Sequence, residues 1–278
     1  MKKQIILPML IMITCCYACE KSNREKVYAG TPERPSLRIK PPRSPVQPLV
    51  DSSGIIHNAV LETLYENANN YQSQQDFAHY LVTAANDNLA KTYDFDPLPK
   101  AVLESSEADI VKLMSNNFYL LQKPQMDSIM NGAIDRLIAS PVINTNEKSM
   151  FNESRNIFNV DASMSESSVF DSIIARASRL LVAYNSRSWA EDEGHAVGGF
   201  LNIAKNSAEY WKNRSGVMQA SKMPPWIKGW GLPQFDAAGY IIGWGKAWLW
   251  DELNTQKKRI GAGLSKAAEW SGISSWFK

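Results

Sequence analysis

Residues 166–186 read ESSVFDSIIARASRLLVAYNS, and this stretch decides the fold class. Its large apolar residues recur three or four positions apart, which places them on one face of a helix, with Arg176 and Arg179 on the other face. The apolar stripe consists of Phe170, Ile173, Ile174, Ala177, Leu180, Leu181 and Tyr184. Such a stripe is stable in water only when it packs against other elements, so the spacing predicts a helical core.

The same helical spacing recurs on both sides of this stretch. Each segment opens with a capping residue, an initiating proline or the first residue of an apolar stripe. The expected helix starts are about residue 53, Ser73, Ser106, Pro124, Ser188, about residue 234 and about residue 257. Because alternating strand patterns are scarce, the sequence predicts an all-α, multi-helix bundle.

Polar residues 141–165 divide the helical sequence into an N-terminal region, 53–140, and a Trp- and Gly-rich region, 166–278. We interpret residues 141–165 as a connection that contains a short helix near Phe151–Phe158. The two regions together hold about 225 residues, which is enough to bury a sizeable core. The sequence leaves open whether they form one large helical domain or two helical subdomains.

Residues 1–18 have the layout of a secretory signal peptide. The basic start Met1-Lys2-Lys3 is followed by an apolar run over residues 5–13 and then by small or polarisable residues. The apolar run is shorter than the about 20 residues that span a bilayer. We therefore expect residues 1–18 to be a cleaved export signal.

Ala18-Cys19 resembles the lipobox of bacterial lipoproteins, although Cys16 and Tyr17 stand where an aliphatic and a small residue are more usual. The resemblance implies that Cys19 is acylated and anchors the chain in the cell envelope, at the outer membrane or the cell surface. The alternative is an ordinary signal peptide that contains cysteines. Because all three cysteines lie within residues 1–19, the folded part can hold no disulfide, cysteine metal site or cysteine nucleophile.

Residues 19–52 have the composition of a basic tether. Between residues 20 and 50, six prolines fall within 17 positions, and seven basic residues stand against three acidic ones. Such a segment favours extended polyproline II structure, at about 3.1 Å per residue. Its excess of positive charge suits attraction to anionic headgroups. A plain solvated spacer is the simpler interpretation.

The charge balance of the whole chain argues against a nucleic-acid partner. The formal charge of +2 comes from Lys2 and Lys3, so the chain from residue 19 onward has 28 basic and 28 acidic residues. A nucleic-acid-binding protein would be expected to carry a basic patch or stripe. Gly243-Trp-Gly-Lys246 lacks the remaining residues of a phosphate-binding loop, and we expect no cofactor.

The C-terminal third is compositionally distinct because all nine tryptophans lie beyond residue 188. The centre of the expected helix 234–254 is apolar on every side apart from Lys246, and such a helix is either buried in a bundle or inserted in lipid. Its apolar length favours a core helix. Gly239-x-x-x-Gly243 would let a neighbouring helix approach closely. Residues 239–263 also resemble the Gly/Ala/Trp-rich helices of small membrane-active, bacteriocin-like peptides.

The loop that contains Trp226, Lys228 and Trp230 is the best candidate for binding that the sequence offers. Tryptophans held by Pro and Gly present rigid, flat faces, which stack on sugars or lie at a membrane interface. The alternative, which we favour, is that these rings fold back and cover the end of the bundle, because large aromatic side chains are usually mostly buried.

Two acidic clusters are weak candidates for metal binding or acid–base chemistry. Glu191 and Glu193 could combine with His195, but helix capping already explains the carboxylates. Asp94 and Asp96 could bind Ca²⁺ or act as acid and base, but an Asp before proline is ordinary turn chemistry. We therefore assign no catalytic residue and no metal site.

Taken together, these features favour a non-catalytic envelope or surface lipoprotein whose helical domain binds another protein or supports an envelope assembly. A second hypothesis is a lipoprotein that binds or hydrolyses glycans through the loop with Trp226 and Trp230. A third is a membrane-active protein that exposes helix 234–254. A groove lined by tryptophans and carboxylates would favour the glycan hypothesis, and a broad apolar patch would favour a protein partner.

Overall fold

Every regular element in the part of the chain that the structure describes is an α-helix, and the protein is an all-α multi-helix bundle. This computed structural model describes residues 46–66, 71–118, 121–161, 163–214, 231–248, 250 and 253–276. The helices are α2 (Gln47–Glu66), α3 (Gln74–Tyr93), α4 (Lys100–Ser115), α5 (Lys123–Ala139), α6 (Thr145–Ser154), α7 (Glu166–Ser186), α8 (His195–Arg214), α9 (Leu232–Ala247) and α10 (Gln256–Trp276).

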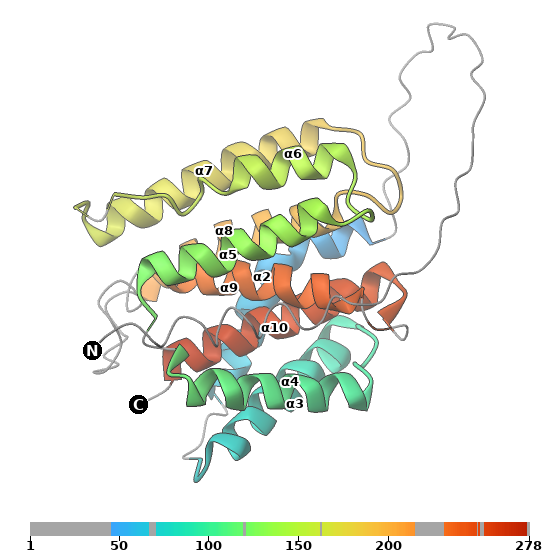
Figure 1. Ribbon diagram of the computed structural model, residues 1–278, viewed down its shortest axis with the longest axis vertical. Coiled ribbons are helices and arrows are strands. Elements are labelled where there is room, and N and C mark those ends of the chain that lie inside the picture. The colour runs from blue at the N-terminus through green and yellow to red at the C-terminus, as the bar shows by residue number, and fades with distance from the viewer. Residues whose placement is uncertain are drawn as a thin grey trace, which may run out of the picture. The chain divides into compact units, whose positions relative to one another are not determined.

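The helices pack in layers around α9 and α10. As Figure 1 shows, α6 and α7 lie on one side of the bundle and α3 and α4 on the other, with α2, α5, α8, α9 and α10 between them. Helices from before and after residues 141–165 pack directly on one another, α2 on α8, α5 on α9 and α3 on α10. Residues Lys40–Lys278 therefore form one unit with a shared core.

The helix predicted from residues 166–186 is present with the expected bounds. Ser165 caps α7, because its hydroxyl accepts a hydrogen bond from the backbone N–H of Ser168 at 3.3 Å. The stripe residues Phe170, Ile173 and Ala177 are buried. They face α8, which packs along α7. The spacing of this stretch thus predicted both the helix and its buried face.

The segment 234–254, expected to form a core helix, does so as α9, but the helix ends at Ala247, seven residues earlier than expected. Its residues from Leu232 to Ile241 are all buried, between α8, α10 and α5. A Cβ atom placed on Gly239 would lie 2.8 Å from the carbonyl oxygen of Lys266, and one on Gly243 would lie 2.5 Å from that of Ala262. These two glycines therefore allow the close approach of α9 and α10 that their spacing suggested.

α2 begins six residues earlier than the sequence predicted. The helix starts at Gln47, so the last residues of the segment expected to be a tether belong to the bundle. Pro48 fits the first helical turn, where its missing N–H would have had no partner. Val50 is fully buried in the first turns of this helix. The proline-rich composition therefore concealed a helix start rather than continued spacer.

α8 begins at His195 rather than near Ser188, so the expected cap at Ser188–Glu191 is wrong. Trp189 holds the chain in a loop, because its indole N–H donates to the carbonyl of Tyr184 at 3.0 Å and its ring stacks on the Tyr184 ring. The loop ends at Gly194, which has a φ of 80° that favours glycine. This packing against α7 outweighs the local capping pattern.

The connection at 141–165 contains α6, which begins six residues before the short helix expected at Phe151–Phe158. Asn144 and Glu147 form a capping box at its start, with the backbone N–H of Glu147 donating to Asn144 Oδ1 at 2.9 Å.

None of the described helices combines the length and the apolar character that are needed to span a bilayer.

Candidate functional site

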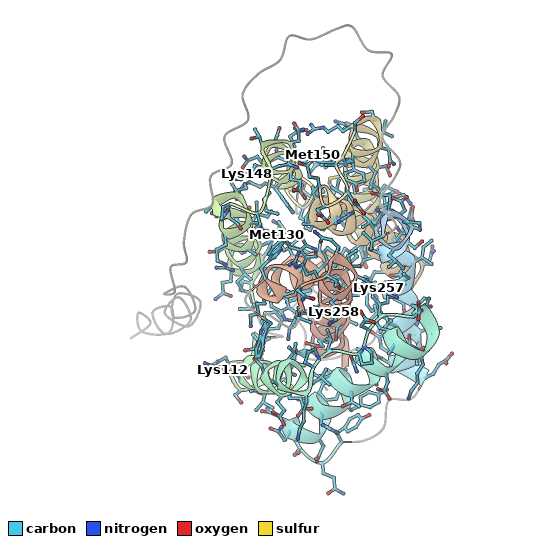
Figure 2. The ribbon with its side chains drawn as sticks, turned by 90° about the vertical axis from the view of Figure 1, so that its right-hand side faces the viewer. Lys112, Met130, Lys148, Met150, Lys257 and Lys258 are labelled. Atoms are coloured by element: carbon cyan, nitrogen blue, oxygen red, sulfur yellow. The ribbon has the colours of Figure 1, made fainter. Side chains whose placement is uncertain are left out.

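One end of the bundle contains a cavity of about 690 Å³. It lies where the end of α9 and the start of α10 meet the loops that precede α6 and α8. Figure 2 faces this end, with Lys257 and Lys258 marking the first turn of α10. Its walls combine two tryptophans, four carboxylates, two basic side chains and several amides, a mixture suited to a polar ligand.

Trp244 and Trp248, one turn apart at the end of α9, form the aromatic wall of the cavity. Their ring centroids are 5.7 Å apart, and the planes meet at 61°. Trp248 is half-buried, whereas Trp244 is only 3% exposed. Neither indole N–H has a hydrogen-bond partner within the described residues. Both N–H groups are also closed to solvent, so the wall presents ring surface rather than hydrogen-bond donors.

Arg259 fixes the position of Trp248. Its guanidinium lies over the indole ring, and it donates to the carbonyls of Leu253 at 3.1 Å and Asn254 at 3.4 Å. Burial lowers the pKa of Arg259, and the nearby Asp192 carboxylate partly offsets this effect. The contact joins the turn between the two helices to the ring, so that the aromatic wall is rigid.

Glu147 forms the deepest part of the acidic wall and is only 3% exposed. Its carboxylate accepts a hydrogen bond from the backbone N–H of Asn144 at 3.4 Å and another from the backbone N–H of Gly194. Burial raises the pKa of Glu147 to about 7, the neighbouring Glu193 raises it further, and the two backbone hydrogen bonds oppose the rise. Glu147 thus clamps the start of α6 to the loop before α8.

Glu191, Asp192 and Glu193 line the outer part of the same wall. The carboxylate of Glu193 accepts from the backbone N–H of Ala190 at 3.1 Å, which closes a turn ahead of α8. In the part of the chain that is described, no Lys, Arg or His nitrogen pairs with the three carboxylates or with Glu147. The capping role expected for Glu191 and Glu193 is not seen, because α8 begins at His195 with no acidic residue in its first turn. These acids lie at the cavity instead.

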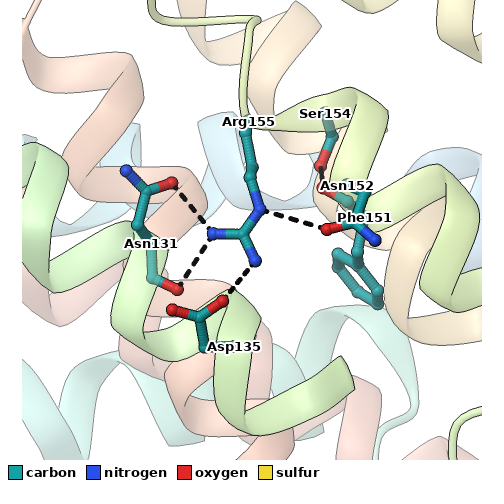
Figure 3. A network of polar contacts seen from close by, with 6 residues as sticks. All are labelled: Asn131, Asp135, Phe151, Asn152, Ser154 and Arg155. Atoms are coloured by element: carbon teal, nitrogen blue, oxygen red, sulfur yellow. Dashed lines mark hydrogen bonds and ion pairs between the residues drawn. The ribbon is translucent and has the colours of Figure 1, made fainter. Parts of the chain in front are cut away.

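An arginine network holds α6 in place behind this wall. Figure 3 shows Arg155, just after α6, donating to Asn131 and Asp135 of α5 and to Asn152 of its own helix. The distance from Arg155 Nη1 to Asn131 Oδ1 is 3.3 Å. Because α5 also packs on α9, the network connects α6, which carries Glu147, to the helix that carries Trp244.

Among the described residues, the other candidates from the sequence do not join the cavity wall. Asp94 ends α3 in the left-handed region, with a φ of 55°, and its carboxylate pairs with Lys257 at 3.0 Å. Asp96 is exposed and lies outside the cavity lining. His195 is buried at the start of α8, and this burial lowers its pKa. No group of three His, Cys, Asp or Glu side chains among the described residues could hold a metal ion. Trp226, Lys228 and Trp230 lie outside the described residues.

A second set of polar residues lies in the core, between α2, α8 and α9. Asp236 of α9 accepts hydrogen bonds from Ser207 and from Trp211 Nε1, and His57 Nε2 is 3.8 Å from its carboxylate. Although Ser, His and Asp are the residues of a hydrolase triad, here the serine donates to the aspartate rather than to the histidine. All three are fully buried, so we interpret them as a structural network between α2, α8 and α9.

No protein-family model matches this chain. No curated protein and no solved structure is significantly similar to it either. Sequence reasoning missed Glu147, Trp244, Trp248 and Arg259. The Asn144-x-x-Glu147 pattern does signal a helix start, but nothing in the sequence indicates that this start faces the end of α9.

Proposed function

We propose that this protein is a lipid-anchored envelope protein whose helical domain binds a carbohydrate in the cavity between α9, α10 and the loops before α6 and α8. The observation that carries the proposal is that two tryptophans and four carboxylates line one cavity of about 690 Å³. Indole rings pack against the C–H faces of sugars, and carboxylates accept hydrogen bonds from sugar hydroxyls. This combination is the one that favours the glycan hypothesis.

Binding without hydrolysis agrees best with the contacts of Glu147. A glycosidase needs a protonated carboxyl that can reach the glycosidic oxygen and a second carboxylate across the sugar. Glu147 has the raised pKa of such an acid, but its carboxylate is buried and accepts two backbone hydrogen bonds. We therefore assign Glu147 to the architecture of the cavity rather than to catalysis.

The two competing functions have less support in the described residues. Four large apolar side chains are exposed among the described residues, and each belongs to a different segment of the chain: Ile55, Val142, Met164 and Val182. A docking surface for a protein is usually a contiguous apolar patch. The apolar residues of α9, which a membrane-active protein would need to expose, are buried.

The binding proposal is tested by isothermal titration calorimetry of the full-length protein in detergent with neutral oligosaccharides. We expect saturable binding that Trp248→Ala weakens by about tenfold, which corresponds to about 1.4 kcal/mol. Tyr80→Ala on α3 is a control, because Tyr80 stacks on Tyr71 and does not line the cavity. No binding by any oligosaccharide, or equal binding by the Trp248 variant, would overturn the proposal.

The anchor is tested separately by membrane fractionation. Cys19→Ala should move the protein from the membrane to the soluble fraction and remove the acyl mass from its N-terminal peptide. Cys15→Ala and Cys16→Ala serve as controls, since these cysteines belong to the expected export signal. Unchanged fractionation of the Cys19 variant would contradict lipid anchoring and would leave the binding proposal unaffected.

A further inference from the structure

We propose that the carbohydrate bound in this cavity carries free, protonated amino groups, and that Glu191 and Glu193 bind them at the acidic wall. The inference rests on the proposed carbohydrate-binding function and specifies its substrate class, an amino sugar without N-acetyl groups. Three observations on the cavity support it, namely its unbalanced charge, its indole rings and the proximity of two of its carboxylates.

The cavity has more negative than positive charge available to a ligand. Four carboxyl groups line it, and in the described part of the chain none of them has a basic partner within 4.0 Å. Burial raises the pKa of Glu147 to about 7, so this group adds little negative charge at a mildly acidic pH. The two basic residues of the lining balance the remaining charge only in part, although Arg259 lies near Asp192. Lys257 pairs with Asp94 at 3.0 Å, and Arg259 covers Trp248 and donates to two carbonyls. A cationic ligand would supply the missing counter-charge.

Trp244 adds aromatic surface beside the acids. It lines the cavity and is only 3% exposed, and its indole N–H is closed to solvent and has no partner among the described residues. Indole rings also attract cations, as Arg259 over Trp248 already demonstrates in this cavity.

The carboxyl groups of Glu147 and Glu193 lie close enough to influence each other. Burial raises the pKa of Glu147, and the charge of Glu193 raises it further. A cation at the wall would be attracted by the charge of Glu193, whereas a neutral sugar would not be attracted and an acidic sugar would be repelled. The electrostatics of the wall therefore rank amino sugars first, neutral sugars second and acidic sugars last.

The experiment compares glucosamine oligomers with N-acetylglucosamine oligomers of the same length and with oligouronates, all titrated into the full-length protein in detergent. At a mildly acidic pH the free amino groups of the glucosamine oligomers are charged. The glucosamine and N-acetylglucosamine oligomers therefore differ only in acetylation and in the charge that acetylation removes. We expect glucosamine oligomers to bind about tenfold more tightly than the acetylated ones. The preference should shrink at high salt, which screens charge.

Two variants locate the effect. Glu193→Gln should abolish most of the preference, because it removes the charge while a glutamine oxygen can still accept from Ala190. Glu104→Gln on the surface of α4, away from the cavity, should retain it. Equal or tighter binding of acetylated oligomers, or a preference that survives Glu193→Gln, would overturn this inference alone. If no sugar binds, the proposed function falls and the inference with it.

Discussion

Arg259 and Trp248 are in direct contact, with the guanidinium carbon of Arg259 3.3 Å from the centroid of the Trp248 ring. The contact joins the first turn of α10 to the residue that follows α9. Arg259 also lies near the Asp192 carboxylate of the acidic wall. The same pair thus holds the aromatic wall against the start of α10.

This contact predicts measurable coupling between the two residues. In a double-mutant cycle of Arg259→Met and Trp248→Leu, followed by urea unfolding, we expect a coupling free energy of about 0.5–2 kcal/mol. Arg179→Met, on the exposed side of α7, should show no coupling with Trp248→Leu. A coupling indistinguishable from zero for Arg259 would mean that the ring is positioned by its other neighbours.

The raised pKa of Glu147 predicts that the free energy of unfolding falls as the pH rises. Its pKa is raised from 4.5 to about 7 in the folded state, so the folded protein holds this proton more tightly than the unfolded chain. The resulting stabilisation is complete below pH 4.5 and is lost as the pH rises through about 7. Across this window the loss amounts to about 3 kcal/mol, since one pKa unit corresponds to about 1.4 kcal/mol.

The variant Glu147→Gln isolates this contribution. Its neutral side chain can accept the same backbone hydrogen bonds, so it should be more stable than the wild-type protein at alkaline pH and similar to it at acidic pH. Urea unfolding across the range, monitored by circular dichroism, gives the difference between the two profiles. Parallel profiles at all pH values would show that Glu147 does not titrate in this window.

The glycines of α9 predict opposite effects of the same substitution. Gly243→Ala should lower the free energy of unfolding by about 1–3 kcal/mol, because the added Cβ would lie 2.5 Å from the carbonyl oxygen of Ala262. Gly245→Ala is the matched control on the same helix. Its Cβ would meet only Leu137 Cδ2 at 3.4 Å, so helix propensity should make it neutral or stabilising by up to about 1 kcal/mol. Thermal unfolding of both variants checks the contrast, and similar losses would contradict it.

A buried ion pair predicts non-additive stability. Lys266 Nζ lies 2.6 Å from Glu269 Oε2, and Ser106 donates to the same carboxylate at 2.8 Å, which joins α4 to α10. Lys266→Met alone should cost about 3–5 kcal/mol, because it leaves a buried carboxylate without its counter-charge. Lys266→Met combined with Glu269→Leu should recover most of this loss in urea unfolding. A double variant as unstable as the sum of the single ones would refute the pairing.

The sequence by itself determined the helices that carry long apolar stripes. α7 agrees with its pattern at both ends, and α9 was recognised as a core helix because its apolar residues occupy every side. The glycine spacing of Gly239 and Gly243 also predicted a close helix contact. These features are local, since periodicity and residue size are properties of a short stretch of chain.

Only the tertiary structure decided where α8 begins and which residues line the cavity. Trp189 packs on Tyr184 of α7, and this contact outweighs a local capping pattern that would have started the helix earlier. The cavity wall brings together residues that are far apart in the sequence, such as Glu147, Glu193 and Trp248. The first two are 46 positions apart and the last two are 55 positions apart. Their convergence depends on how α6, α8 and α9 pack, because long-range packing, unlike periodicity, is not encoded in any single stretch.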